Sequence, residues 1–141
     1  LVSKNDIDPK LIHIEVTESA YIDNPTLIAP CVSKLHKYGF VIELDDFGTG
    51  YSSLTTLSEL EIDILKIDKS ILEDDRIGSK KSVLGFSLEL SKVLGLETVV
   101  EGVETLDQLL RIKSLGATFV QGFYFSKPLP ENEFVEFVAR S

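Results

Sequence analysis

Two adjacent aspartates follow an apolar segment near the middle of the chain. The segment Phe40-Val-Ile-Glu-Leu has the composition of a buried strand, and Asp45 and Asp46 come directly after it. Adjacent carboxylates in such a place repel each other and lose solvation unless a cation lies between them. A mobile glycine-rich loop is expected next, at Phe47, Gly48, Thr49 and Gly50. This segment therefore predicts a divalent metal site with a loop beside it.

Every predicted strand ends at or next to a group that can bind a metal, a proton or a phosphate. We predict strands at residues 11–16, 40–45, 62–67, 97–101 and 117–121, and their polar end residues are Glu15, Asp45, Lys66, Glu101 and Gln121. In α/β sheets and barrels, ligands bind at the carboxyl ends of the strands. One such residue could be a solvated loop start, and Lys66 could be only a counter-ion to the acids. Five at equivalent positions favour a shared site.

Helical patterns lie between and after these strands, near residues 25–38, 51–60, 79–94, 105–115 and 131–138. Asn24 followed by Pro25 is a typical helix start, and Thr105 with Gln108 can form a capping box. Alternating strands and helices are typical of a parallel sheet. The sequence thus predicts an α/β fold in which about five parallel strands alternate with helices.

Composition limits the classes of function that the chain can have. The 141 residues, 43% apolar and 26% charged, suit one soluble globular core. The net charge of −9 does not suit binding to a nucleic-acid backbone, so no nucleic acid is expected as a partner. No apolar run reaches the roughly eighteen residues of a membrane span, so no direct membrane insertion is expected. The single cysteine, Cys31, excludes an internal disulfide and lies on an apolar helical face, which predicts a core position.

Strand parity places further polar residues on the face that carries the strand-end groups. Side chains alternate with period two, so His13 shares a face with Glu15, and Glu43 shares a face with Asp45. If their strands are neighbours, His13 and Glu43 could form a charge-assisted hydrogen bond. The alternative is that each binds water or backbone separately. The opposite face is expected to pack under helices through Ile12, Ile14, Phe40, Ile42 and Leu44.

Five motifs in this order resemble those of the EAL family of cyclic-di-GMP phosphodiesterases. They are Ile14-Glu15-Val-Thr-Glu18-Ser19, Asp45-Asp46-Phe-Gly-Thr-Gly-Tyr-Ser-Ser-Leu54, Leu65-Lys66-Ile-Asp68, Glu101-Gly-Val-Glu104 and Gln121-Gly122-Phe-Tyr-Phe-Ser-Lys-Pro128. The resemblance implies a modified TIM-like (β/α) barrel with one antiparallel strand. A typical barrel has about 250 residues, so residues 1–141 are expected to form a partial barrel, the C-terminal portion of one EAL-type domain. The family's Glu-Ala-Leu segment and a further asparagine ligand would lie upstream of residue 1.

The resemblance also implies a role for each matching residue. Glu15 and Asp45 resemble ligands of a first metal ion, and Asp45 would bridge to a second ion that Asp46 and Glu101 help to hold. Lys66 resembles the lysine that orients the attacking water, with Glu101 and Gln121 as further catalytic groups. Glu18 resembles the anchor of the loop at residues 47–50. The ions would be Mg²⁺ or Mn²⁺, since carboxylate oxygens suit hard cations, in a two-metal site that is incomplete in this fragment.

The implied reaction is metal-dependent hydrolysis of cyclic-di-GMP to linear pGpG by the complete domain, and the 141-residue fragment alone is expected to be inactive. Two alternatives stay open: a non-catalytic cyclic-di-GMP receptor, and a signalling or dimerisation module. A homodimer or the rest of the parent chain is the expected protein partner, because a partial barrel exposes two edge strands. The cytoplasm is the expected compartment, since the substrate would be made there.

Overall fold

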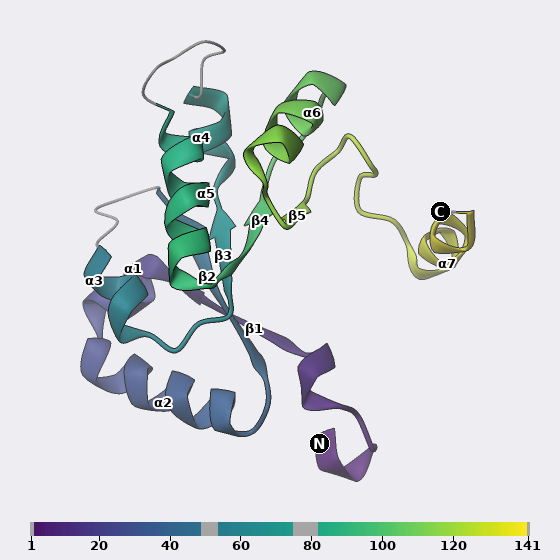
Figure 1. The fold of residues 1–141 in the computed structure, drawn as a ribbon. Helices are drawn as coiled ribbons and strands as arrows, with labels where there is room; N and C mark the ends of the chain where they lie inside the picture. Colours follow the sequence, from purple (N-terminus) through teal and green to yellow (C-terminus); the bar gives the residue numbers. More distant parts are fainter. Residues whose placement is uncertain (1, 49–53, 75–81, 141) are drawn as a thin grey trace.

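A five-stranded parallel sheet forms the centre of the molecule (Figure 1). The computed structural model describes residues 2–48, 54–74 and 82–140. The strands are β1 (His13–Thr17), β2 (Val41–Phe47), β3 (Ile64–Ile67), β4 (Glu97–Val100) and β5 (Phe119–Val120). They pair in sequence order, and each pair is parallel. The predicted α/β fold with about five parallel strands is confirmed.

Helices follow the strands, and all but the last of them cover one face of the sheet. They are α1 (Glu18–Asp23), α2 (Pro25–Lys37), α3 (Leu54–Glu59), α4 (Lys69–Asp74), α5 (Val83–Leu94), α6 (Leu106–Leu115) and α7 (Glu131–Arg140), and two 3₁₀ turns, η1 (Val2–Lys4) and η2 (Pro9–Leu11), precede β1. The predicted capping box of Thr105 and Gln108 is present at the start of α6. Helices α1 and α4 were not predicted from the sequence, because each has only six residues; α1 begins directly after β1, and α4 begins one residue after β3 ends.

The apolar core lies between the helices and the face of the sheet that was predicted to be apolar. Ile42 and Leu44 are fully buried, and Ile14 and Phe40 pack partly buried against them. The helices contribute buried side chains to the same cluster, among them Val32, Leu84, Leu88 and Ile112. Burial of these side chains is the main force that holds the helices on the sheet.

The prediction of a core position for Cys31 was wrong, because this residue is exposed. Helix α2 turns Val32 into the core, with Ile28 and Leu35 partly buried beside it. These three positions have the i, i+4, i+7 spacing of one narrow helical stripe. Cys31 falls on the flank of that stripe, as does Leu27, which is 62% exposed.

A β-bulge interrupts the pairing of β2 with β3. The register shifts between Leu44 and Phe47, so that Asp45 and Asp46 of β2 together oppose the single residue Lys66 of β3. Such a bulge inserts one extra residue and changes which side chains point to each face. The two adjacent aspartates are therefore not equivalent: they leave the strand in different directions.

The bulge also explains why β2 runs further than predicted. Asp46 has a φ of +59°, a left-handed conformation that aspartate tolerates better than most residues. Because of the extra residue, Phe47 returns to the face of Leu44, where it is buried in the core. The predicted strand end at Asp45 was thus too early by two residues, since β2 continues to Phe47.

Strands β1 and β5 are the two edges of the sheet. The face of the sheet opposite the apolar core, which we call the inner face, is open in the described part of the chain (Figure 1). Helix α7 lies apart from the sheet at the end of an extended connection (Figure 1), and none of its residues is buried. No helix among the described residues has the length and apolar composition that crossing a membrane requires. Because the inner face is open, its polar residues are the candidates for a functional site.

Candidate functional site

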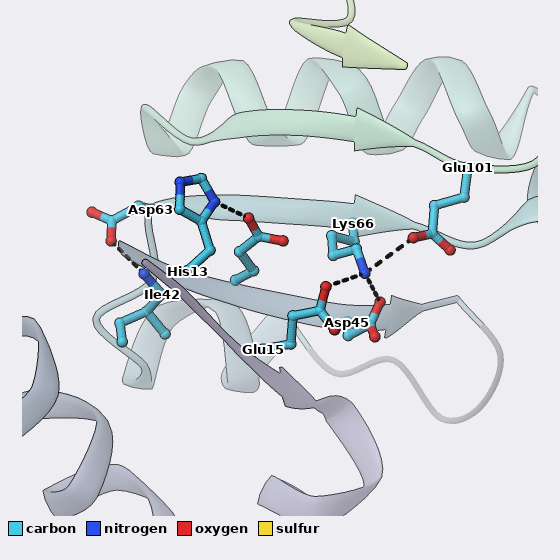
Figure 2. Close-up of polar contacts among 8 residues, drawn as sticks. His13, Glu15, Ile42, Asp45, Asp63, Lys66 and Glu101 are labelled. Carbon is cyan, nitrogen blue, oxygen red and sulfur yellow. Dashed lines mark hydrogen bonds and ion pairs between the residues drawn. The ribbon is translucent and has the colours of Figure 1, made fainter. Parts of the chain in front are cut away.

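Lys66 binds three carboxylates that come from three other strands or their ends (Figure 2). Its Nζ lies 2.8 Å from Glu15 Oε1, 2.9 Å from Asp45 Oδ1 and 3.1 Å from Glu101 Oε1. Glu15 is the middle residue of β1, Asp45 lies in the C-terminal part of β2, and Glu101 directly follows β4, so the lysine on β3 links four strands. The structure thus brings together four of the residues that the sequence analysis proposed for the site.

The lysine remains an ammonium ion in this setting. Burial of its side chain, which is only 9% exposed, would by itself lower the pKa of Lys66. The hydrogen bonds to Glu15, Asp45 and Glu101 outweigh burial and raise the pKa well above its usual value. Lys66 therefore carries a fixed positive charge, although one ammonium cannot balance three carboxylates.

Asp46 and Gln121 lie beside this cluster. Asp46 is exposed, and its backbone N–H donates a hydrogen bond of 3.0 Å to Asp45 Oδ1. The backbone N–H of Gln121 donates to the carbonyl of Val100 at 2.9 Å, which places Gln121 next to the strand end that carries Glu101. The Gln121 side chain is exposed, and the described contacts of Lys66 do not include it.

Glu18 lies buried at the start of α1. Thr17 caps this helix by accepting a hydrogen bond of 3.3 Å from the backbone N–H of Ala20. A carboxylate in the first turn is stabilised by the helix dipole. The predicted loop partners Thr49 and Gly50 lie outside the described residues, so the loop-anchor role stays a prediction.

Gly48, the second residue of the predicted loop, occupies a position that only glycine fits. Its φ is +100°, and a Cβ built there would lie 2.1 Å from Ile71 Cδ1 of α4. The backbone after the two aspartates therefore passes very close to a buried side chain.

Of the two alternatives left open for His13 and Glu43, the structure shows the direct hydrogen bond. His13 Nδ1 contacts Glu43 Oε1 on the inner face of the sheet (Figure 2). The His13 side chain is 45% exposed, whereas that of Glu43 is 9% exposed. The alternative, in which each residue finds a separate partner, was wrong.

The residues of the site fit a hard divalent cation in their chemistry. Glu15, Asp45, Asp46 and Glu101 offer only carboxylate oxygens, the ligands that Mg²⁺, Mn²⁺ and Ca²⁺ prefer. As they lie, no three carboxylate, imidazole or thiolate groups within the described ranges form a cluster that could bind one ion. Three of the carboxylates share the Lys66 ammonium instead.

A hollow of about 500 Å³ lies between the residues after β5 and helix α7. Its lining includes Gln121, Phe123 and Phe134, but no residue of the Lys66 cluster. It does not coincide with the carboxylates. The strand ends, and not this hollow, are the candidate site.

Comparison with known proteins decides the family. The description of the family model that matches residues 1–128 is "EAL domain". The chain belongs to the EAL domain family. Its fold is accordingly part of a TIM-like barrel, the fold of EAL domains. The carboxylate cluster on Lys66 lies at the strand ends of this EAL domain chain, the side on which barrels of this kind place their active sites.

The similarity to individual EAL proteins extends over nearly the whole chain. The probable cyclic di-GMP phosphodiesterase PdeB of Escherichia coli K12 is 39% identical over 135 residues, which are 96% of this chain and 25% of PdeB. The crystal structure of the EAL domain of Mycobacterium smegmatis DcpA has a TM-score of 0.83 and 32% identity, over 99% of this chain and 63% of that one. A manganese and cyclic-di-GMP complex of Klebsiella pneumoniae BlrP1 has a TM-score of 0.81 and 33% identity, over 90% of this chain and 33% of that one. The chain thus spans only a quarter of PdeB.

Proposed function

We propose that this chain supplies the C-terminal portion of an EAL domain that hydrolyses cyclic-di-GMP to linear pGpG with divalent metal ions. The observation that carries the proposal is the convergence of Glu15, Asp45 and Glu101 on Lys66 Nζ, within 3.1 Å. Relatives named cyclic di-GMP phosphodiesterases support it, among them PdeB of Escherichia coli and RocR of Pseudomonas aeruginosa. Packing does not require three acids and a buried lysine to meet on the same face of the sheet, whereas a metal-dependent phosphodiesterase site uses acidic ligands of this kind.

The metal ligands in this proposal are Glu15, Asp45, Asp46 and Glu101. BlrP1 structures are named as manganese and calcium complexes, which supports a divalent ion, and we propose Mg²⁺ or Mn²⁺ in a two-metal site. When bound by these residues and the upstream ligands, two such ions would supply an activated water and stabilisation of the leaving oxygen of a phosphodiester. The ligand set is incomplete in these 141 residues, since further ligands are expected from an upstream segment.

The other site residues position the attacking water and the carboxylates. The Lys66 ammonium donates hydrogen bonds that hold Asp45 and Glu101 in place, and it orients the attacking water. Gln121, next to the Glu101 strand end, offers a further amide to that water. Water adds to phosphorus and one P–O ester bond breaks, so the product keeps one terminal phosphate and gains one hydroxyl group.

In the complete protein, other segments are expected to cover the exposed parts of this portion of the domain. The open inner face and the edge strands β1 and β5 would be covered by the rest of the parent chain or by a second copy. Glu18 would anchor the loop at residues 47–50 from the start of α1. We propose the cytoplasm as the compartment and cyclic-di-GMP as the ligand, without nucleic acid as a partner.

The test compares hydrolysis of cyclic-di-GMP in Mn²⁺ by this chain and by the same chain extended upstream by about 110 residues, toward the length of a full barrel. We expect pGpG only from the extended chain. Absence of pGpG from both, with retained binding of cyclic-di-GMP, would replace the proposal by a non-catalytic receptor. Absence of both hydrolysis and binding would leave a signalling or dimerisation module.

A further inference from the structure

Two glutamates stand directly opposite each other on the inner face of the sheet. In the parallel register of β1 and β2, Glu15 pairs with Glu43. Like charges at directly opposed positions of a sheet destabilise it. The repulsion is strengthened here because the Glu43 side chain is only 9% exposed. Such a pair is stable when each carboxylate has a cation or a hydrogen-bond donor of its own.

The two glutamates bind different cationic or donor groups. Glu15 accepts a hydrogen bond of 2.8 Å from Lys66 Nζ, whereas Glu43 contacts His13 Nδ1. His13 pairs with Val41 in the register, so it reaches Glu43 diagonally, two residues further along β2. Figure 2 shows His13 and Lys66 on the same side of the sheet, with His13 nearer the amino ends of the strands and Lys66 nearer their carboxyl ends.

Without His13, Glu43 would compete for the lysine of the site. Glu43 opposes Ile64 on β3, and Lys66 is the next residue of β3 on the same face. A buried carboxylate that has lost its partner is strongly destabilising, so it recruits a cation within reach. Lys66 already serves three carboxylates, and a fourth would draw its ammonium away from the strand ends.

We propose that His13 is a positioning residue: by binding Glu43, it keeps the Lys66 ammonium on Glu15, Asp45 and Glu101. The relevance of this arrangement to catalysis rests on the proposed phosphodiesterase function. The arrangement itself can be measured without metal or substrate, so its failure is distinguishable from failure of the proposed function.

The test follows the side-chain ammonium resonance of Lys66 by ¹⁵N NMR in the full chain, assigned with Lys66→Arg. Three variants and one combination are compared: His13→Leu removes the donor, His13→Asn keeps an N–H near the position of Nδ1, Glu43→Gln removes the competing charge, and His13→Leu with Glu43→Gln removes both. The backbone amide spectrum of each variant reports whether it is folded.

We expect His13→Leu to shift or broaden the Lys66 resonance, while His13→Asn and Glu43→Gln leave it in place and the combination restores it. A structural role alone would change the melting temperature without moving this resonance. An unchanged Lys66 resonance in folded His13→Leu, or no restoration in the combination, would overturn the proposal. If His13→Leu does not fold, Glu43→Gln still decides, because a lost Lys66 resonance there means that Glu43 supports the lysine and does not compete for it.

Discussion

Asp45 Oδ1 and Lys66 Nζ lie 2.9 Å apart, at the point where the register of β2 and β3 shifts and two aspartates oppose one lysine. The bulge sends Asp45 toward the lysine and leaves Asp46 exposed beside it. Because Glu15 and Glu101 bind the same ammonium, the strand ends carry more negative than positive charge. This excess is the physical reason to expect a divalent cation at the site.

Replacement of Lys66 should show how this excess negative charge affects stability and the response to a divalent ion. We expect Lys66→Met to lower the free energy of unfolding by about 2–3 kcal/mol, because three carboxylates lose their shared hydrogen-bond donor. We also expect Mn²⁺ to raise the melting temperature of Lys66→Met more than that of the wild type, since the ion then supplies the missing charge. Thermal unfolding with and without Mn²⁺ measures both effects.

The matched control for that variant is Lys34→Met, at an exposed position of α2. It removes the same charge from the chain but not from the site, so stability should change by no more than about 0.5 kcal/mol. An equal response of the two variants to Mn²⁺ would show that the ion binds elsewhere.

The contact between Tyr21 and Glu59 predicts a change of stability at alkaline pH. The Tyr21 hydroxyl on α1 donates a hydrogen bond to Glu59 on α3, and this bond, burial and the negative charge of Glu59 raise the pKa of Tyr21. A pKa raised by folding gives stability that is full below the unfolded pKa, about 10, and is lost as pH rises through the folded pKa. Tyr21→Phe should therefore be less stable than the wild type by about 1 kcal/mol at pH 7.

Urea unfolding across alkaline pH measures this difference. The gap between wild type and Tyr21→Phe should close once the pH passes the folded pKa of Tyr21. Tyr124→Phe is the control, since Tyr124 lies after β5, away from α1, and is 39% exposed. A gap that stays constant up to strongly alkaline pH would mean that Tyr21 does not contribute through its proton.

Two glycines allow the cost of a left-handed backbone to be measured separately from the cost of steric overlap. Gly48 has a φ of +100° and no room for a Cβ beside Ile71, whereas Gly95 has a φ of +73° and no atom within 4 Å. We expect Gly95→Ala to cost about 1 kcal/mol from its left-handed backbone alone, and Gly48→Ala to cost more, about 3 kcal/mol, because Ile71 must also move. Urea unfolding of the two variants compares the costs, and equal costs would show that the Ile71 contact relaxes without penalty.

The sequence predicted the fold well where a pattern is local. Alternating strands and helices, helix starts such as Asn24-Pro25, and the polar strand ends are all short-range signals. Side-chain parity predicted that His13 and Glu43 lie on one face, and their contact depended on β1 pairing with β2, which the structure shows. Apart from this pairing, the predictions needed no knowledge of how distant segments meet.

Other features depend on neighbours that a local pattern does not reveal. The bulge at Asp46 is set by how β2 pairs with β3, and it moved the end of β2 to Phe47. Cys31 fits an apolar stripe of α2, but the sheet contacts a narrower part of that stripe. The contact of Lys66 with Glu15 crosses the strand between them, so only the assembled sheet reveals it.

The most direct test of a metal-dependent phosphodiesterase site at Asp45 is release of pGpG from cyclic-di-GMP by the EAL domain that carries residues 1–141. We predict that the wild type requires Mn²⁺ or Mg²⁺, that chelation abolishes its activity, and that Asp45→Asn lowers kcat at least about 100-fold, while Asp107→Asn, at an exposed position of α6, has no effect. Hydrolysis that survives chelation, or that proceeds at the wild-type rate in Asp45→Asn, would contradict the account.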